Sequence, residues 1–205
     1  MLYYILWLVL RPFIELFVKV EGRENIPNCG PVIVVSNHIH DLDPYFIGPF
    51  LPFSMPVRWF SKKELYDIRA LRDEYSPKVN SRLLGWILAW ITVLMVKHSL
   101  TIPVDREDAK SKMNKSTIKK ALTFLKKRKR VIGIFGEGGI GRKGEVQPIF
   151  VSLAKTTGAP ILPVKVEKRS TLKLNISFGE LITVNRKDGD NQEIAENIMK
   201  KIYEM

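Results

Sequence analysis

The sequence predicts an α/β fold: a single domain in which helices flank a mostly parallel or mixed central sheet. From residue 31 onward, short β-branched or apolar runs alternate with longer helical patterns. Several of these runs are apolar almost throughout, as expected of strands that are buried on both faces. With 205 residues, of which 45% are hydrophobic, the chain is long enough to bury one substantial core.

Six short runs are the candidate strands of this sheet, because each is rich in β-branched or apolar residues. They are residues 31–36, 57–60, 101–104, 131–135, 161–166 and 172–178. The C-terminus is predicted to be a helix, because Asp190 and Glu193 form a D-x-x-E capping pattern. Isoleucines follow at four-residue steps, as one face of a helix requires: Ile194, Ile198 and Ile202.

The charge of the chain favours polyanionic partners. Thirty-three Lys and Arg against 21 Asp and Glu give a net charge of +12, which suits nucleic acid, an anionic membrane surface or phosphorylated substrates. Residues 110–130 hold ten basic side chains and no acid, and their apolar residues recur at helical steps. We expect an amphipathic basic helix there, with a plain solvated helix as the alternative. Its only aromatic residue is Phe124, which argues against nucleic acid as a partner.

Two apolar segments bear on membrane binding. Residues 1–10, "MLYYILWLVL", are almost wholly apolar, but Arg11 ends the run well short of the ~20 residues of a spanning helix. The second segment, residues 83–96, would be about 21 Å long as a helix, against a hydrocarbon core of about 30 Å. Trp86 and Trp90 would share one face of that helix. We expect interfacial binding by one or both segments.

This pattern divides the chain into an N-terminal apolar membrane-associating helical segment, residues 1–20, and a domain of residues 21–205. The single cysteine, Cys29, excludes an internal disulfide framework, so a cytoplasmic location is the default. The apolar N-terminus has neither the basic region nor the cleavage pattern of a signal peptide. The expected location is the cytoplasmic face of the cell membrane, with peripheral or monotopic attachment.

The stretch "SNHIHDLDP", residues 36–44, follows the first predicted strand, where loops of α/β proteins carry function. At this spacing the Asp43 carboxylate can accept a hydrogen bond from one imidazole nitrogen of His38 and leave the other nitrogen as a base. No GxSxG motif or reactive cysteine lies nearby, so the proton would come from a substrate hydroxyl. Two plainer alternatives stay open: Asp43 as a helix N-cap before Pro44, and the histidines as loop residues.

A metal site is not predicted, and one of the histidines is preferred as the base. His98 is distant in sequence, and neither an H-E-x-x-H pattern nor a cysteine cluster is present. His40 competes with His38 for the role of base, but the residue five positions after His40 is Tyr45 rather than an aspartate. We therefore assign the base to His38.

Four blocks in order resemble the motifs of the glycerolipid acyltransferases, the family that includes the bacterial 1-acylglycerol-3-phosphate acyltransferases. "NHIHDLD" resembles its N-H-x4-D motif, "TIPVDRE" (101–107) its second motif, "IFGEGGIGR" (134–142) its F-P-E-G-T-R motif and "ILPV" (161–164) its fourth. The stretch "SKKEL" (61–65) is similar to the lysine-containing segment that usually follows the first motif.

The resemblance implies an enzyme that acylates the sn-2 hydroxyl of 1-acylglycerol-3-phosphate and so makes phosphatidic acid in phospholipid biosynthesis. His38 would deprotonate the hydroxyl as it attacks an acyl thioester, and Asp43 would hold the imidazole. No acyl-enzyme and no cofactor are implied, because acyl-CoA or acyl-ACP is the co-substrate. The expected partners are the lysophospholipid, the acyl thioester and an anionic membrane surface, with acyl carrier protein as a further candidate.

The family's pattern assigns the acceptor phosphate to basic residues, here Arg106 and Arg142, with Lys62 as a further candidate. Surface salt bridges are the alternative role for all three. Glu137 and Gly138 match the core of the third motif. Glu137 would bind polar groups of the acceptor or orient an arginine, and the glycine would let backbone N–H groups approach an anion. A tight turn at the strand exit is the alternative.

Departures from the family pattern bear on the acceptor. Gly136 replaces the usual proline, Gly139 replaces the usual threonine, and Arg142 lies five residues after Glu137 rather than three. Arg142 is therefore a less secure phosphate ligand than Arg106. An acyltransferase of the same family that acts on another lysolipid is the runner-up.

Outside the enzyme class, a second hypothesis is a basic peripheral membrane-binding protein that keeps the fold without turnover. The net charge and the two apolar segments fit this hypothesis. The intact histidine–aspartate pair argues against it, because a module that only binds membranes has no need of a base.

Overall fold

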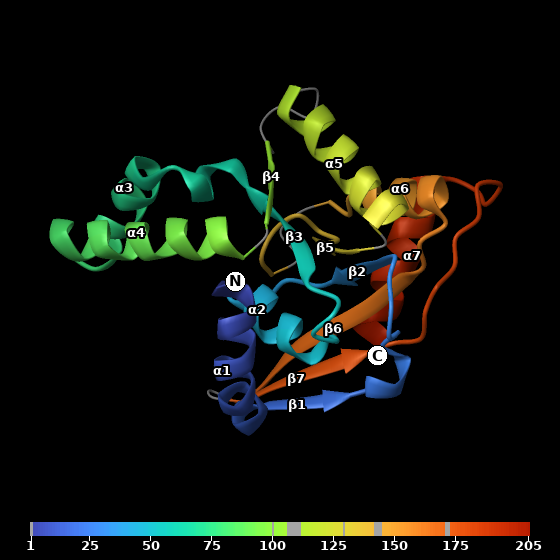
Figure 1. The fold of residues 1–205 in the computed structure, drawn as a ribbon, viewed down its shortest axis with the longest axis horizontal. Helices are drawn as coiled ribbons and strands as arrows, with labels where there is room; N and C mark the ends of the chain where they lie inside the picture. The colour runs from blue at the N-terminus through green and yellow to red at the C-terminus, as the bar shows by residue number, and fades with distance from the viewer. Residues whose placement is uncertain (1, 100, 106–111, 129, 142–144, 171–172) are drawn as a thin grey trace. The chain divides into compact units, whose positions relative to one another are not determined.

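The computed structural model describes residues 2–99, 101–105, 112–128, 130–141, 145–170 and 173–205. The chain forms two compact units. The sheet unit comprises Tyr4–Val57 and Lys120–Met205, and the hairpin unit comprises Met1–Tyr3 and Arg58–Lys119. Strands and helices alternate along the chain, which confirms the predicted α/β class (Figure 1).

Among the described residues, five strands build the sheet of the sheet unit, in the order β1-β7-β6-β2-β5. They are β1 (Val18–Glu21), β2 (Val32–Ser36), β5 (Val131–Phe135), β6 (Ile161–Ser170) and β7 (Lys173–Phe178). β2 runs parallel to both β5 and β6, and β1 runs parallel to β7. β6 and β7 are antiparallel. The prediction of a mixed, mostly parallel sheet is confirmed.

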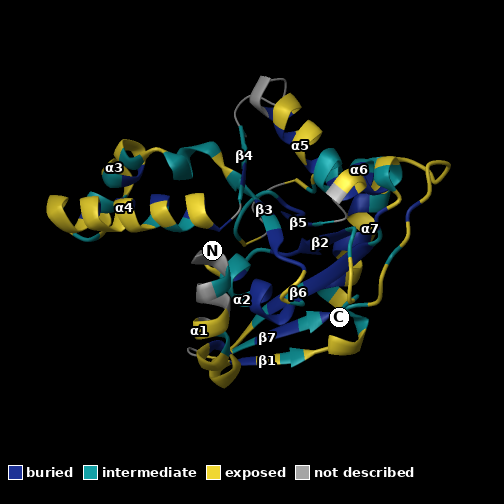
Figure 2. Ribbon diagram, viewed as in Figure 1, coloured by how far each residue is buried: buried dark blue, intermediate teal, exposed yellow. Residues whose placement is uncertain are grey.

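The two central strands β2 and β5 are buried along their whole length, and their ribbons are dark blue in Figure 2. This burial explains why their sequences are unbroken apolar runs rather than alternating ones. In their register Ser36 lies opposite Phe135, the last residue of β5. The loops that follow the two strands therefore leave the same edge of the sheet next to each other.

Helices α6 (Ile149–Thr157) and α7 (Asn191–Glu204) pack against each other and against the central strands, α6 on β2 and α7 on β6. The predicted C-terminal helix is thereby confirmed. Asp190 caps α7 by accepting hydrogen bonds from the backbone N–H groups of Glu193 and Gln192, which lower the pKa of Asp190. The buried face of α7 consists of Ala195, Ile198, Met199 and Ile202.

The remaining elements of the sheet unit are short or lie near the N-terminus. They are α1 (Leu2–Phe17), which begins in the hairpin unit, the 3-10 turns η1 (Arg23–Asn25) and η2 (Gly48–Phe50), and α2 (Asp43–Ile47). None of the helices in the described part of the chain combines the length and the apolar character that crossing a bilayer requires. The membrane-associating role of residues 1–20 stays a prediction.

The hairpin unit is built on two antiparallel-packed helices and a strand pair. The helices are α3 (Ile68–Lys78) and α4 (Arg82–His98), which pack along each other. The parallel strands are β3 (Val57–Lys62) and β4 (Ile102–Val104), and the 3-10 turn η3 (Lys63–Tyr66) follows β3. An ion pair of 2.9 Å between Lys63 Nζ and Asp105 Oδ1 joins the segments after the two strands. Residues 83–96, for which a helix was considered, lie within α4.

Helix α5 (Lys112–Arg128) coincides with the predicted basic helix. Of the apolar residues at helical steps, Ala121 and Leu125 are fully buried, Leu122 is half-buried and Ile118 is exposed, as are Lys119 and Lys120. The apolar steps therefore mark the packed face from residue 121 onward.

Three elements, β1, α3 and α6, were not predicted. The β1 sequence "VKVE" is only four residues long, and it forms a strand by pairing with β7, more than 150 residues later. Most of α3 is polar, and only Leu71 is buried. Its helical state depends on packing against α4, which the local sequence does not encode.

Candidate active site

The end of β2 is fixed to the neighbouring strand by a buried asparagine. The side-chain amide of Asn37 donates to the carbonyl oxygen of Val166 at 2.8 Å, and its oxygen accepts from the Val166 N–H at 2.7 Å. These two bonds extend the ladder between β2 and β6 by one residue with a side chain in place of backbone. The chain therefore leaves the sheet at a defined point, directly before His38.

The next residues form the histidine–aspartate loop, residues 37–43. His38 Nδ1 lies 2.8 Å from Asp43 Oδ2. The same oxygen accepts from the backbone N–H groups of Ile39 and His40, at 2.8 and 2.9 Å. Asp43 is fully buried, and only 12% of the His38 side chain is exposed. Because Nδ1–H donates this hydrogen bond and the carboxylate accepts it, the other ring nitrogen, Nε2, is left as a base.

Asp43 is the first residue of α2, but its carboxylate does not cap that helix. Its three recorded donors all precede it in the chain. Asp43 Oδ1 is buried and has no hydrogen-bond partner among the described residues. The alternative of Asp43 as a helix cap therefore does not describe this geometry, since the carboxylate organises the loop that carries His38.

The imidazole of His38 lies against an aromatic ring from the neighbouring strand. The ring centroids of His38 and Phe135 are 3.9 Å apart, and the planes are inclined by only 12°. Phe135 is opposite Ser36 in the register of β2 and β5, so the strand pairing itself brings the two rings together. This stacking and the bond to Asp43 together restrict how the imidazole can turn.

The glycine-rich loop, residues 136–141, follows β5 and is hydrogen-bonded to the histidine–aspartate loop. Gly136 N donates to the carbonyl oxygen of Ser36 at 3.1 Å, and Gly141 N donates to that of His38 at 2.8 Å. Gly138 and Gly141 have φ angles of 63° and 72°, a region that favours glycine. Gly138 therefore does lie in a tight turn after the strand. This turn places Glu137 next to the histidine–aspartate loop.

The C-terminal helix supports the glycine-rich loop from a distant part of the sequence. Tyr203 Oη, in α7, donates to Glu137 Oε2 at 2.7 Å, and only 7% of Glu137 is exposed. One turn earlier in α7, Met199 packs so closely on Gly136 that a Cβ at position 136 would overlap its sulfur atom. With Met199 in this position, glycine at 136 avoids the overlap that a residue with a Cβ would make.

With this geometry described, comparison with known proteins decides the family. A family model described as Acyltransferase matches residues 17–167, which is most of the chain. The chain belongs to the acyltransferase family.

Two known proteins are similar to this acyltransferase. The 1-acyl-sn-glycerol-3-phosphate acyltransferase of Saccharomyces cerevisiae is 30% identical over 169 residues, which cover 80% of this chain and 47% of the yeast protein. The chain thus spans about half the length of that curated relative. The crystal structure of the 1-acyl-sn-glycerophosphate (LPA) acyltransferase PlsC from Thermotoga maritima matches with a TM-score of 0.62 and 18% identity, over 97% of this chain and 77% of that one. This second likeness is one of fold.

The structure brings four of the predicted site residues of this acyltransferase together. His38 and Asp43 are in direct contact, and the hydrogen bond from Gly141 to His38 joins their loop to the one that carries Glu137 and Gly138. His40 differs from His38: it is exposed, and its Nδ1 accepts from the Leu42 N–H at 3.2 Å rather than facing a carboxylate.

The predicted phosphate ligands are described less fully. Arg106 and Arg142 lie outside the described residues. Lys62 is the last residue of β3 in the hairpin unit, where it is exposed. The roles of all three in binding the acceptor stay predictions. Among the residues that the structure does describe, no three His, Cys, Asp or Glu side chains gather as a metal-binding group.

Sequence reasoning missed three residues of the candidate site: Asn37, Phe135 and Tyr203. Two of them carried a signal, because Asn37 and Phe135 belong to the blocks "NHIHDLD" and "IFGEGGIGR" that carry the family resemblance. Tyr203 carried none, since it lies 66 residues after its partner Glu137. The sequence shows only that Tyr203 follows Met199 by four positions, which places both on the same side of a helix.

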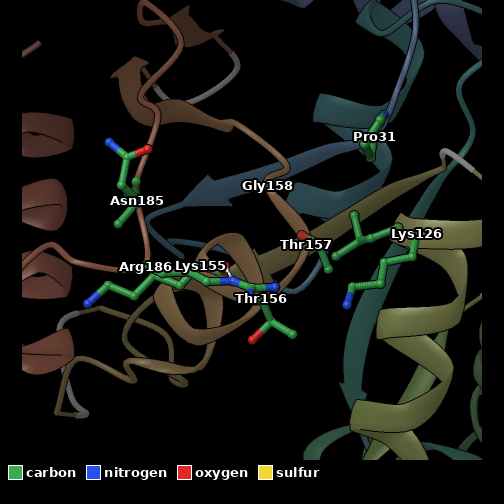
Figure 3. A pocket seen from close by; sticks show the side chains of 10 residues that line it. Pro31, Lys126, Lys155, Thr156, Thr157, Gly158, Asn185 and Arg186 are labelled. Atoms are coloured by element: carbon green, nitrogen blue, oxygen red, sulfur yellow. Dashed lines mark hydrogen bonds between the residues drawn. The ribbon is translucent and has the colours of Figure 1, made fainter.

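A surface pocket of about 510 Å³ lies at the opposite end of β2, because it includes Pro31, the residue before that strand (Figure 3). Two of its basic residues, Lys155 and Arg186, serve local structure. Lys155 Nζ donates to the carbonyl oxygens of Asp188 and Gly189 at 2.7 Å each, and Arg186 Nε donates to that of Lys155. These bonds close the turn before α7. The pocket is separate from the histidine–aspartate loop, which follows β2 rather than preceding it.

Proposed function

We propose that this acyltransferase transfers a fatty acyl chain from acyl-CoA or acyl-ACP to the sn-2 hydroxyl of 1-acylglycerol-3-phosphate, with phosphatidic acid as the product. The observation that carries this proposal is the 2.8 Å bond between His38 and a fully buried Asp43, which leaves Nε2 as the basic nitrogen. The name of the yeast relative supports the choice of acceptor.

In the proposed reaction, His38 Nε2 takes the proton of the acceptor hydroxyl as the oxygen attacks the thioester carbonyl carbon. Asp43 stabilises the imidazolium that forms, because its carboxylate is already bonded to Nδ1. The new C–O bond forms, the C–S bond breaks, and the thiol of the donor leaves with the proton from the imidazolium. No covalent acyl-enzyme is needed, since the hydroxyl attacks the thioester directly.

The proposed acceptor site lies around the glycine-rich loop. Glu137, held by Tyr203, is placed to bind a polar group of the glycerol. The N–H groups of Gly138 and Gly141 donate to the carbonyl oxygens of Phe135 and His38, so these glycines shape the turn that presents Glu137. Arg106, Arg142 and Lys62 are the proposed phosphate ligands. The amphiphilic acceptor and product support the proposed location at the cytoplasmic face of the cell membrane, with peripheral or monotopic attachment.

A second candidate, another lysolipid as acceptor, is favoured by one observation. Met199 occupies the space beside Gly136, so the glycine-rich loop departs from the family pattern at its first residue. A loop changed there can present Glu137 to a different headgroup.

The test is to incubate the purified protein with a labelled acyl thioester and a panel of lysolipids, and to identify the product by mass. The expected product is phosphatidic acid, made from 1-acylglycerol-3-phosphate. If a lysolipid with another headgroup were acylated in preference, the second candidate function would be correct instead. His38→Ala is the control. If this variant kept full vesicle binding and no lysolipid was acylated by the wild type, the protein would be the non-catalytic membrane-binding module instead.

A further inference from the structure

The most unusual surface of the molecule is one side of α4, in the hairpin unit. Its other side packs on α3: Gly85, Ala89, Val93 and Val96 are buried at steps of three and four residues. Gly85 approaches so closely that a Cβ there would lie 2.8 Å from Ser76 Cα. The hairpin of α3 and α4 is therefore tightly packed on its inner side, and this packing determines which residues of α4 face outward.

The outward side of α4 is apolar without interruption. All eight exposed side chains between positions 83 and 94 are large and apolar, and they include Trp86, Ile87, Trp90 and Ile91. They form the yellow stretches of α4 in Figure 2. Trp90 is 58% exposed. A contiguous exposed patch of this kind marks an interaction surface, because soluble proteins rarely leave one uncovered.

Among the described residues, the unpaired cations nearest this patch lie at the two ends of α4. Arg82 is its first residue and Lys97 lies in its last turn, and from residue 75 to residue 104 the chain has no Asp or Glu. In α3, Arg72 and Lys78 are ion-paired with Asp73 and Glu74. The guanidinium of Arg72 in α3 lies 5.4 Å from the ring centroid of Trp86. Cations at both ends of an apolar stretch with tryptophans suit the headgroup level of an anionic lipid layer.

We propose that α4 is a lipid-docking helix, which lies in the plane of one leaflet of an anionic bilayer with its outward side among the acyl chains. The apolar stretch from 83 to 96 is about 21 Å long, too short for a hydrocarbon core of about 30 Å, so an in-plane orientation follows. The proposal rests on the proposed function in one respect: a lysophospholipid acceptor and its product reside in such a leaflet.

A second copy of the chain fits this surface less well. If two α4 helices packed antiparallel, Arg82 of each would lie near Lys97 of the other, and parallel packing would place like residues side by side. Both arrangements bring cations together in a segment without acids. Anionic headgroups neutralise the same cations. Charge complementarity therefore favours the lipid surface.

The N-terminal helix α1 is the other candidate for lipid contact. Among its described side chains, Leu8, Val9, Phe13, Leu16 and Phe17 are exposed, and Arg11 and Glu15 form an ion pair of 3.1 Å. Lipid contact through α1 is compatible with docking through α4.

The test compares two double variants of the full chain: Trp86→Gln with Trp90→Gln on α4, and Phe53→Gln with Leu181→Gln as a matched control. The replaced side chains are similarly exposed, at 39% and 58% on α4 and at 51% and 42% in the control. Sedimentation with vesicles of phosphatidylcholine and phosphatidylglycerol measures the Kd. The α4 variant should bind at least about tenfold more weakly, whereas the control should stay within about twofold.

Two further measurements keep the outcome decisive. Circular dichroism and light scattering check that the variants are folded and whether their oligomeric state has changed. Unchanged vesicle binding by the α4 variant would overturn the proposal. A wild-type dimer that became monomeric in this variant would assign the surface to a second copy.

His38→Ala should bind vesicles like the wild type. A protein that binds vesicles through α4 but acylates no lysolipid would leave the docking helix standing and refute the proposed function alone.

Discussion

Two neighbouring loops of the site are stabilised in different ways. In the histidine–aspartate loop, the Asp43 carboxylate collects its three recorded donors from residues 38–40, within five positions of itself. In the glycine-rich loop, Glu137 is bonded to Tyr203 in the C-terminal helix, and Gly136 lies under Met199 of the same helix. The first loop is organised by its own residues, and the second depends on a segment more than 60 residues away.

The difference separates two tasks of the proposed reaction. The position of the base follows from a short sequence, whereas the position of the acceptor-binding carboxylate follows from the packing of α7. Changes within the first loop should therefore act mainly on the chemical step. Changes in α7 should act mainly on the acceptor, although no residue of α7 belongs to a family motif.

The largest expected effect is that of His38→Ala. Loss of the proposed general base should lower kcat by ~10² to 10⁴ while the melting temperature stays near that of the wild type. The loop should persist because Asp43 keeps its bonds to the N–H groups of Ile39 and His40. Steady-state kinetics and thermal unfolding measure the two quantities.

His40→Ala is the matched control for this prediction. The His40 ring is exposed, and it accepts only a local hydrogen bond from Leu42, so kcat should stay within about twofold of the wild type. If His40→Ala were the more damaging substitution, the assignment of the base would be wrong.

Asp43→Asn should lower activity by ~10² or more and, unlike His38→Ala, should also destabilise the protein. Asparagine keeps an acceptor oxygen but loses the charge, and it introduces an N–H₂ group at a fully buried position. The free energy of unfolding should fall by about 1–3 kcal/mol, measured by urea denaturation. An Asp43→Asn variant as stable and as active as the wild type would show that the carboxylate does not organise this loop.

Tyr203→Phe should reduce kcat/KM for the lysolipid by about tenfold and leave the KM for the acyl donor unchanged, because it removes the hydrogen bond that positions Glu137. In a double-mutant cycle with Glu137→Gln, the two losses should be less than additive, since both substitutions break the same bond. Tyr75→Phe is the control: it removes a hydroxyl that bonds to Thr92 in the hairpin unit. Equal losses for donor and acceptor in Tyr203→Phe would mean that Tyr203 supports only the fold.

The smallest expected effect is on stability, and it compares two glycines of the glycine-rich loop. A Cβ at position 136 would overlap the sulfur of Met199, whereas a Cβ at position 139 meets no atom within 4 Å. Because the methionine side chain is flexible and can shift, Gly136→Ala should lower the free energy of unfolding by about 1 kcal/mol, and Gly139→Ala should change it by less than about 0.5 kcal/mol. Thermal unfolding of both variants checks this. Equal stabilities would show that Met199 moves aside without cost.

The sequence by itself determined the central strands and the contact between His38 and Asp43. The runs at 31–36 and 131–135 became β2 and β5, because their unbroken apolar character requires burial on both faces. The spacing from His38 to Asp43 was sufficient to predict their contact, since five residues of chain place the carboxylate within reach of the imidazole. The strands follow from a pattern along the sequence, and the contact follows from residues that are close in the sequence.

Only the tertiary structure decided the rest of the site. The ring of Phe135 reaches His38 because β5 pairs with β2 in one particular register, and Tyr203 reaches Glu137 because α7 packs back on the sheet. The outward side of α4 was likewise decided by packing: its sequence is apolar on every side, and the contact with α3 covers one of them. Contacts between distant segments leave no periodic signal in the chain, because they depend on the free energy of packing the whole fold rather than on local pattern.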